Sequence, residues 1–305
     1  MKKLLDHIKS PSPIQLIQSE LLRKRKIKLY IKREDLLHPI VSGNKWRKLK
    51  YNLKHAIDSQ KSPIITFGGS FSNHLYATAG ACHALGIPSI GIVRGEIDSE
   101  NPTLKFCLSH NMNLIPCSRS DYREGQQSQS FKNLLSAYPT AHVVPEGGTN
   151  ELALVGIAEL WEEIKTQFRN APEFTCLPVG TGGTAAGLLS NMPEDCLLVG
   201  YSALKTDHLY NEVCNLLGIT SRINLYIKTQ YHFGGYGKTD FSLLSFIRNF
   251  EKEHNIPLDP IYTGKAMYGL MADIEQGKFP PGSTLLFIHT GGLQGINGVK
   301  YLAYK

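Results

Sequence analysis

The most constraining feature of the sequence is a repeated alternation of short apolar runs, glycine-rich turns and helical patterns. In residues 63–69, for example, an apolar run ends in two glycines and leads into the helical pattern of residues 70–86. Strands that alternate with helices in this way are typical of βαβ units, and they predict an α/β fold with mainly parallel sheets. Ligands of such sheets bind outside the carboxyl ends of the strands. The glycine turns are therefore expected to meet at a shared site; the apolar runs are residues 63–69, 89–95, 114–118, 142–148, 174–180, 197–204 and 284–292.

Composition and charge exclude several classes of protein. The 305 residues are 42% hydrophobic and 19% charged, which is ordinary for a globular chain large enough for two lobes. No apolar run reaches the roughly 18 residues that span a bilayer. Because the N-terminus also lacks the apolar stretch of a secretory signal, we expect a cytoplasmic protein without membrane contact. The six cysteines have no C-x-x-C spacing, which predicts reduced thiols and no metal site.

The net charge of +7 raises the question of a nucleic-acid partner. The densest positive run is residues 23–33, and Tyr30 is its only aromatic residue. No nucleic-acid-binding motif surrounds this run, so we interpret it as a solvated face and expect no nucleic-acid partner.

A glycine-rich turn after the apolar run of residues 174–179 predicts a phosphate site. Glycines let backbone N–H groups approach an anion closely, and a following helix adds a partial positive charge. A dinucleotide fold would require an acidic residue at the end of the next strand, and residues 197–205 contain none. The P-loop pattern is absent, and a glycine turn without any ligand stays open from this motif alone. The residues concerned are Gly180, Thr181, Gly182, Gly183 and Thr184.

A cluster of positive charges in residues 41–50 opens a second helical pattern. Lys45, Arg47 and Lys48 fall where clustered positive charge opposes the helix dipole, which suggests that the cations serve an anionic ligand. A lysine of lowered pKa in such a place could also form a Schiff base with an aldehyde. From this motif alone, an exposed basic helix start is the simpler interpretation.

Three further turns carry polar side chains. Residues 68–74 offer hydroxyl and amide groups at a helix start, which suit a carboxylate, although simple helix capping explains them equally well. His74 follows them and has either a catalytic or a structural role. Residues 261–265 and 289–292 each place a hydroxyl at a glycine turn, and neither is informative by itself.

Taken together, these segments resemble the family of D-cysteine desulfhydrase and 1-aminocyclopropane-1-carboxylate deaminase. This family belongs to the tryptophan-synthase-β-like, fold type II, pyridoxal-phosphate (PLP) enzymes. The resemblance runs through nearly the whole chain in the order IKREDLL, SGNKWRKL, GGSFSNH, PEGGTN, PVGTGGTAAG, GGYG, YTGKAMYGL and HTGG. It implies two domains, each a mainly parallel twisted sheet flanked by helices. The large PLP-binding domain is expected to comprise residues 1–52 and 148–305, and the small inserted domain residues 53–147.

The resemblance also implies a role for each matching residue. Lys45 would form the Schiff base with PLP and later take the Cα proton. Lys48 and Asn73, with the loop from Gly180 to Thr184, would hold the phosphate. The remaining roles are catalytic for Ser72 and Tyr262, substrate-binding for Ser72, His74 and Tyr236, and contact with the cofactor ring for Thr263 and Thr290.

Position 263 helps to choose between the two activities. The deaminases carry glutamate there, whose charge keeps the pyridine nitrogen protonated, whereas this chain has the neutral Thr263 of the desulfhydrases. The expected function is therefore β-elimination from D-cysteine, giving pyruvate, sulfide and ammonia. Ring opening of 1-aminocyclopropane-1-carboxylate and PLP binding without turnover are the alternatives. The expected partner is a small amino acid, with a homodimer implied only by the family.

The chain also departs from the family pattern. Tyr76 stands where arginine is common, Trp46 replaces a small residue beside Lys45, and residues 237–241 differ from the usual loop. These departures concern the choice of substrate rather than the binding of PLP.

Overall fold

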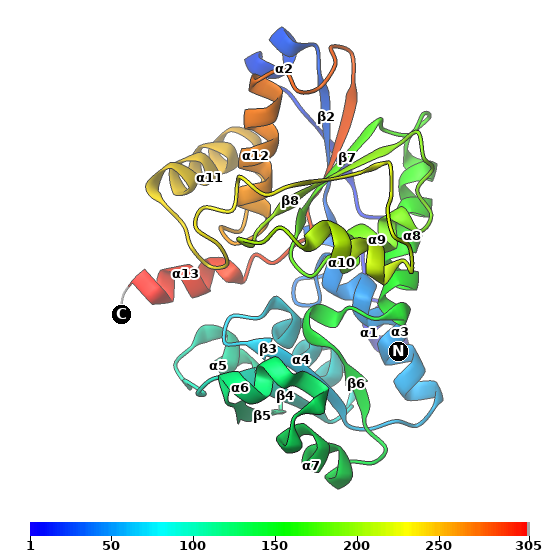
Figure 1. Ribbon diagram of the computed structural model, residues 1–305, viewed down its shortest axis with the longest axis vertical. Coiled ribbons are helices and arrows are strands. Elements are labelled where there is room, and N and C mark those ends of the chain that lie inside the picture. Colours follow the sequence, from blue (N-terminus) through cyan, green and yellow to red (C-terminus); the bar gives the residue numbers. More distant parts are fainter. Residues whose placement is uncertain (304–305) are drawn as a thin grey trace.

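The computed structural model describes residues 1–303, which form two sheets in separate halves of the molecule (Figure 1). The six-stranded sheet has the order β1-β2-β10-β7-β8-β9, and the four-stranded sheet has the order β5-β4-β3-β6. Only β1 is antiparallel to its neighbour; the other pairs are parallel. The strands are β1 (Ile14–Ile17), β2 (Lys28–Lys32), β3 (Ile64–Gly69), β4 (Ser89–Arg94), β5 (Met112–Cys117), β6 (His142–Val144), β7 (Phe174–Val179), β8 (Leu197–Ser202), β9 (Leu225–Lys228) and β10 (Thr284–Ile288).

Helices connect most of the strands. They are α1 (Lys2–Leu5), α2 (Glu20–Arg25), α3 (Asn44–Asp58), α4 (Asn73–Leu85), α5 (Pro102–Ser109), α6 (Arg119–Glu124), α7 (Gln129–Ala137), α8 (Glu151–Gln167), α9 (Gly183–Leu189), α10 (Leu209–Leu216), α11 (Phe241–His254), α12 (Thr263–Glu275) and α13 (Gly295–Ala303). The predicted α/β fold with mainly parallel sheets flanked by helices is confirmed. In the described part of the chain, no helix is long and apolar enough to cross a membrane.

The larger sheet is buried on both faces, as its apolar strands require. Alternate residues of β10 point to opposite sides: Leu285 joins a core with α11 and α12, whereas Leu286 joins a core with α8, α9 and α10. Because successive side chains of a strand face opposite ways, a continuous apolar run serves both cores. This arrangement fixes the strand ends that carry the glycine turns.

The smaller sheet shares part of its core with α3. Trp46, Leu49 and Leu53 pack in one cluster with Leu4 and Ala77. The predicted boundary between residues 52 and 53 falls inside this helix. The exact domain limits therefore stay a prediction, while the two sheets themselves are distinct.

Candidate active site

A single cavity of about 320 Å³ collects most of the predicted site residues. Its wall includes Lys45 and Lys48 from α3, the start of α4, the whole glycine loop after β7, and two tyrosines from the C-terminal half of the chain. These residues are far apart in sequence and meet because the parallel strands end at the same edge of each sheet. The predicted residues in the wall are Lys45, Lys48, Ser72, Asn73, His74, Gly180, Thr181, Gly182, Gly183, Thr184, Tyr236, Tyr262 and Thr290.

The two lysines of α3 lie on one helical turn and face the same cavity. The Lys45 ammonium donates to Asn44 Oδ1 at 3.1 Å. The Lys48 ammonium donates to Gly147 O at 3.0 Å and to Thr149 Oγ1 at 2.9 Å. All three acceptors are neutral, and among residues 1–303 neither lysine forms an ion pair. In the described part of the chain, both lysines therefore face the cavity without a carboxylate in direct contact.

Burial changes the protonation of these lysines. It lowers the pKa of Lys45 to about 8, and the carboxylate of Asp259 only partly opposes this shift. Burial, assisted by the neighbouring positive charge of Lys45, holds the pKa of Lys48 well below its ordinary value. An anion bound between the two would stabilise their charged forms.

The glycine loop approaches the lysines closely because it has no side chains in the way. A Cβ on Gly183 would lie 2.5 Å from Thr149 Oγ1 and 3.0 Å from Lys48 Nζ, and a Cβ on Gly180 would lie 3.0 Å from the ring of Tyr262. Gly182 has a φ of 78°, a conformation that favours glycine. A side chain at Gly183 would fill the space between the loop and Lys48, whereas one at Gly182 would meet Val213 of α10 at 3.0 Å.

Residues 72–74 begin α4 and play different roles. Ser72 caps the helix, its hydroxyl accepting from Leu75 N at 3.2 Å. The Asn73 side-chain oxygen accepts from the amide of Gln294. Simple capping thus accounts for Ser72, as one of the two interpretations expected, although Ser72 also lies in the cavity wall.

His74 is buried in a defined neutral form. Thr66 gives its single hydroxyl hydrogen to Val144 O at 2.8 Å, so it accepts from His74 Nε2 at 2.7 Å. The Nδ1 atom then carries a lone pair, and within residues 1–303 it has no hydrogen-bond partner. Burial, followed by the charges of Lys45 and Lys48, keeps the pKa of His74 well below its ordinary value.

Thr263 is the predicted site residue that the structure does not bring into the cavity wall. Its hydroxyl donates to Asp259 Oδ2 at 2.6 Å and accepts from Asp259 N at 2.8 Å. The side chain is fully buried and completes the turn that starts α12. Thr290, by contrast, lines the cavity, and its backbone oxygen contacts the start of α3 through Asn44 N at 3.2 Å.

Three polar or charged residues of the cavity wall have no role predicted from the sequence. Asn44 bridges Lys45 and Thr184, donating to Thr184 Oγ1 at 2.9 Å. Arg94 at the end of β4 and Glu146 after β6 add a cation and an anion to the wall. Both stand at the ends of predicted strands, which was the signal that could have identified them.

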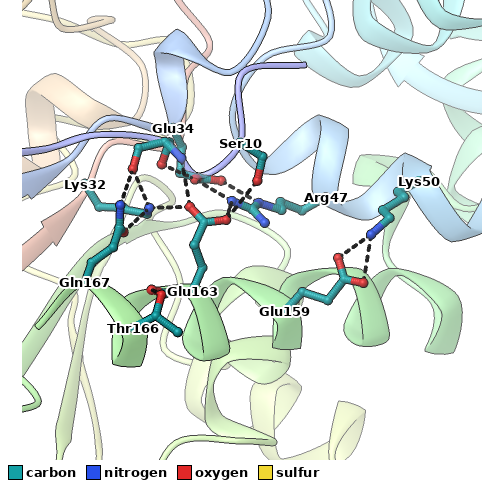
Figure 2. A network of polar contacts seen from close by, with 10 residues as sticks. Ser10, Lys32, Glu34, Arg47, Lys50, Glu159, Glu163, Thr166 and Gln167 are labelled. Carbon is teal, nitrogen blue, oxygen red and sulfur yellow. Dashed lines mark hydrogen bonds and ion pairs between the residues drawn. The ribbon is translucent and has the colours of Figure 1, made fainter. Parts of the chain in front are cut away.

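Arg47, which had been grouped with the ligand-binding cations, faces away from the cavity into a buried charge network (Figure 2). Its guanidinium donates to both oxygens of Glu34 at 2.9 Å and to Glu163 Oε2 at 2.8 Å. Lys32 also pairs with Glu163 and donates to Gln167 at 2.6 Å. Since Arg47 lies between Lys45 and Lys48, the network anchors the helix that carries both lysines.

We expect Glu163→Gln to lower the free energy of unfolding by about 2 kcal/mol at pH 7. Arg47 would keep its pairing with Glu34, but Lys32 would lose its carboxylate. Burial acts to raise the pKa of Glu163, yet Arg47 and Lys32 outweigh it and hold that pKa below its ordinary value. The stabilisation is therefore present above the unfolded pKa of glutamate and disappears as the pH falls through the folded pKa.

Urea unfolding of both proteins between pH 7 and pH 3 measures this difference. The matched control is Glu162→Gln, one residue away, whose partner Lys165 is about half exposed; it is expected to change stability by less than about 0.5 kcal/mol. Equal effects of the two substitutions would contradict an anchoring role for the network.

The fold and the cavity together define an α/β protein in which a glycine loop faces two buried lysines across one cavity. Residues 9–291 match the family described as pyridoxal-phosphate dependent enzyme. The chain belongs to this family, and pyridoxal phosphate is its cofactor.

Similar proteins bear related names. A protein of Pyrococcus horikoshii, provisionally named a 1-aminocyclopropane-1-carboxylate deaminase, is 33% identical over 93% of this chain and 90% of its own length. The bifunctional D-cysteine desulfhydrase/1-aminocyclopropane-1-carboxylate deaminase of Arabidopsis thaliana is 32% identical over 88% of this chain and 73% of its own length. The crystal structure of an ACC deaminase homologue, 30% identical, superposes with a TM-score of 0.82 over 98% of this chain and 95% of that one.

Proposed function

We propose that the chain is a PLP-dependent lyase that removes the β-substituent of D-cysteine, so that D-cysteine and water give pyruvate, ammonia and sulfide. The observation that carries this proposal is the pair of buried lysines on one turn of α3, which donate only to neutral acceptors and face a glycine loop across one cavity. Relatives named for D-cysteine desulfhydration support the substrate class. Ring opening of 1-aminocyclopropane-1-carboxylate is the second candidate, because the same relatives are named for it.

The residues present fit the cofactor. The glycine loop lies against the ammonium of Lys48, where a Cβ on Gly183 would lie 3.0 Å from Nζ, and such backbone with a nearby cation suits a phosphate. Lys45, with its pKa lowered to about 8, suits a covalent bond to an aldehyde, since the free amine is accessible near neutral pH. We therefore assign the phosphate to the loop, Lys48 and Asn73, and the aldehyde carbon to Lys45.

The remaining steps belong to the side chains of the wall. Bound PLP supplies an electron sink for the bond that breaks at Cα. Lys45 is the group we assign to take the Cα proton, since a base is most effective when its pKa is near the working pH. Burial raises the pKa of Tyr262 well above 10, so this phenol stays protonated and can donate to a departing sulfur. Ser72 and Asn73 are assigned to the substrate's carboxylate end and the phosphate respectively, and His74, buried behind them, to orienting this helix start.

We assign the ring nitrogen of the cofactor to Thr290 rather than Thr263. The Thr263 hydroxyl is fully used by Asp259, whereas Thr290 lies in the cavity wall. Thr290→Val is expected to lower kcat for elimination by about tenfold, the effect of one lost hydrogen bond, with little change in stability. Thr263→Val is expected to lower the free energy of unfolding by about 2 kcal/mol because Asp259 loses its hydroxyl partner. Steady-state kinetics and urea unfolding of both variants test this assignment, and the reverse pattern would transfer the ring contact to Thr263.

The phosphate assignment predicts a loss of cofactor affinity in Gly182→Val. The φ of 78° is strained for valine, and a Cβ there would lie 3.0 Å from Val213 of α10. The loop would have to shift and carry its backbone amides away from the phosphate, and we expect at least a tenfold weaker PLP affinity, measured by equilibrium dialysis. Gly218→Val is the matched control, because Gly218 has a similar φ of 67° and open space around it. The two variants carry similar backbone strain. If Gly182→Val and Gly218→Val bound PLP with equal affinity, the loop would not be the phosphate site.

A screen of purified protein tests the proposed activity. The substrates are D-cysteine, L-cysteine, D-serine, β-chloro-D-alanine and 1-aminocyclopropane-1-carboxylate, with keto acid and sulfide measured separately. We expect the highest kcat/KM for D-cysteine. Faster ring opening than sulfide release would favour the deaminase activity. Cofactor binding without turnover of any of these substrates would indicate a protein that carries PLP and is not an enzyme.

A further inference from the structure

The irregular segment of residues 229–240 carries Tyr236 into the cavity wall and has little regular structure of its own. Phe233, Gly234, Gly235 and Gly237 all have positive φ angles. Glycine adopts such angles freely, whereas Phe233 keeps its positive φ only where surrounding contacts fix it. The contacts that hold this segment therefore decide where Tyr236 lies.

One face of α12 provides these contacts. The aromatic ring of Tyr268 packs edge-on against Phe233 at 5.0 Å between centroids. Gly269 leaves room for the ring of Tyr231, which a Cβ would meet at 2.7 Å, and the Tyr231 hydroxyl donates to Asp273 at 2.6 Å. Positions 265, 268, 269 and 273 share one side of a helix, so the segment lies along a continuous stripe of α12.

Lys265 is the polar centre of that stripe. Its ammonium is buried and donates to His232 O at 2.9 Å and to Gly235 O at 2.7 Å. The same two carbonyls close two successive turns, accepting from Gly235 N at 3.0 Å and from Lys238 N at 3.2 Å. Each carbonyl oxygen has two lone pairs, so it can accept from a backbone N–H and from the ammonium at the same time. The Lys265 ammonium therefore links the turn from His232 to Gly235 with the turn from Gly235 to Lys238.

Tyr236 lies inside the second of these turns, which runs from Gly235 to Lys238. Its ring meets Tyr262 edge-on at 6.0 Å between centroids, and Tyr262 precedes Lys265 by three residues. Lys265 and Tyr262 therefore fix the same side chain from two directions, through the backbone and through the ring. Lys265 itself is not in the cavity wall. It can act on the wall only through the segment that carries Tyr236.

We propose that Lys265 is a positioning residue that holds residues 232–236 closed over the cavity and thereby sets the position of Tyr236 against the substrate. Burial lowers the pKa of Lys265 to about 8, opposed by Asp259, which agrees with a buried ammonium that donates to two neutral carbonyls. This inference rests on the proposed function for its kinetic consequence but not for its structural one.

Hydrogen exchange of the PLP-bound enzyme tests the structural consequence. In Lys265→Met, which keeps an apolar stem of similar length, peptides covering residues 229–240 are expected to exchange roughly tenfold faster. Peptides from β4 and α5 should not change. Lys165→Met, which removes an exposed lysine of α8, is the control and should leave the whole pattern unchanged. Unchanged exchange in residues 229–240 of Lys265→Met would overturn the proposal, whether or not the enzyme acts on D-cysteine.

A double-mutant cycle tests the link to Tyr236. Lys265→Met and Tyr236→Ala are each expected to raise KM severalfold with a smaller effect on kcat, since both remove contacts made equally in the ground and transition states. If the lysine acts through the tyrosine, the double variant should resemble Tyr236→Ala alone. Additive effects on KM would overturn the proposal. Should Lys265→Met fail to fold, Gly235→Ala provides the same test, because its φ of 112° is strained for alanine and the change displaces the carbonyl that the lysine binds.

Discussion

Replacing Lys45 with alanine is expected to lower the rate of β-elimination by at least about a thousandfold, because the variant loses both the covalent anchor of the cofactor and the base at Cα. The visible absorbance of the lysine-bound cofactor should disappear with it. PLP itself should still bind through its phosphate, since Lys48 and the glycine loop are untouched. Stopped-time sulfide assays and absorbance spectra of the purified variant measure both effects.

Lys50→Met is the control for this substitution. Lys50 lies on the same helix and pairs with Glu159 at 2.6 Å on the partly exposed side, away from the cavity wall. Its replacement should leave the absorbance and the rate within about a factor of two of the wild type. Comparable losses in the two variants would mean that α3 is merely sensitive to substitution.

The second large effect is expected from Gly156→Ala. A Cβ at this position of α8 would lie 2.0 Å from the backbone oxygen of Arg47 on α3, so the two helices would have to separate. Alanine favours a helix by about 1 kcal/mol over glycine, but the overpacking should outweigh this gain and cost roughly 3–5 kcal/mol of unfolding free energy. PLP affinity should fall as well, because α3 carries Lys45 and Lys48.

Val155→Ala, at the neighbouring exposed position of α8, is the control and should alter stability by no more than about 0.5 kcal/mol. Urea unfolding with equilibrium dialysis of PLP distinguishes the two variants. A stable Gly156→Ala protein with normal PLP affinity would show that the close contact between α3 and α8 is not needed for the site.

Much of the architecture was predictable because its signal is local. All seven apolar runs contain strands of the two parallel sheets, since a buried parallel strand must be apolar on both faces. The loop at Gly180–Thr184 and the lysines of α3 were identifiable for the same reason, as each belongs to one short segment. β2 lies outside these runs, in the extended segment of residues 27–34. β1 and β9 were missed, because four residues with mixed burial leave little pattern to detect.

Ion pairs between residues far apart in the sequence could not be predicted. Nothing local to Arg47 indicates that it binds Glu34 and Glu163 rather than an anionic ligand, because these acids come from a different turn and a different helix. The structural role of Thr263 could have been predicted from the residues around it. Asp259 accepts from three backbone amides at the start of α12, and an aspartate just before a helix is a familiar capping signal.

The location of the cofactor bond is the centre of this account, and one measurement addresses it directly. The PLP-bound enzyme is reduced with borohydride, digested, and the peptide that carries the pyridoxyl group is identified by mass spectrometry. We expect the label on Lys45, in the peptide that contains Ser42, Gly43 and Asn44. A label on Lys48, on Lys265 or on any other lysine would contradict it.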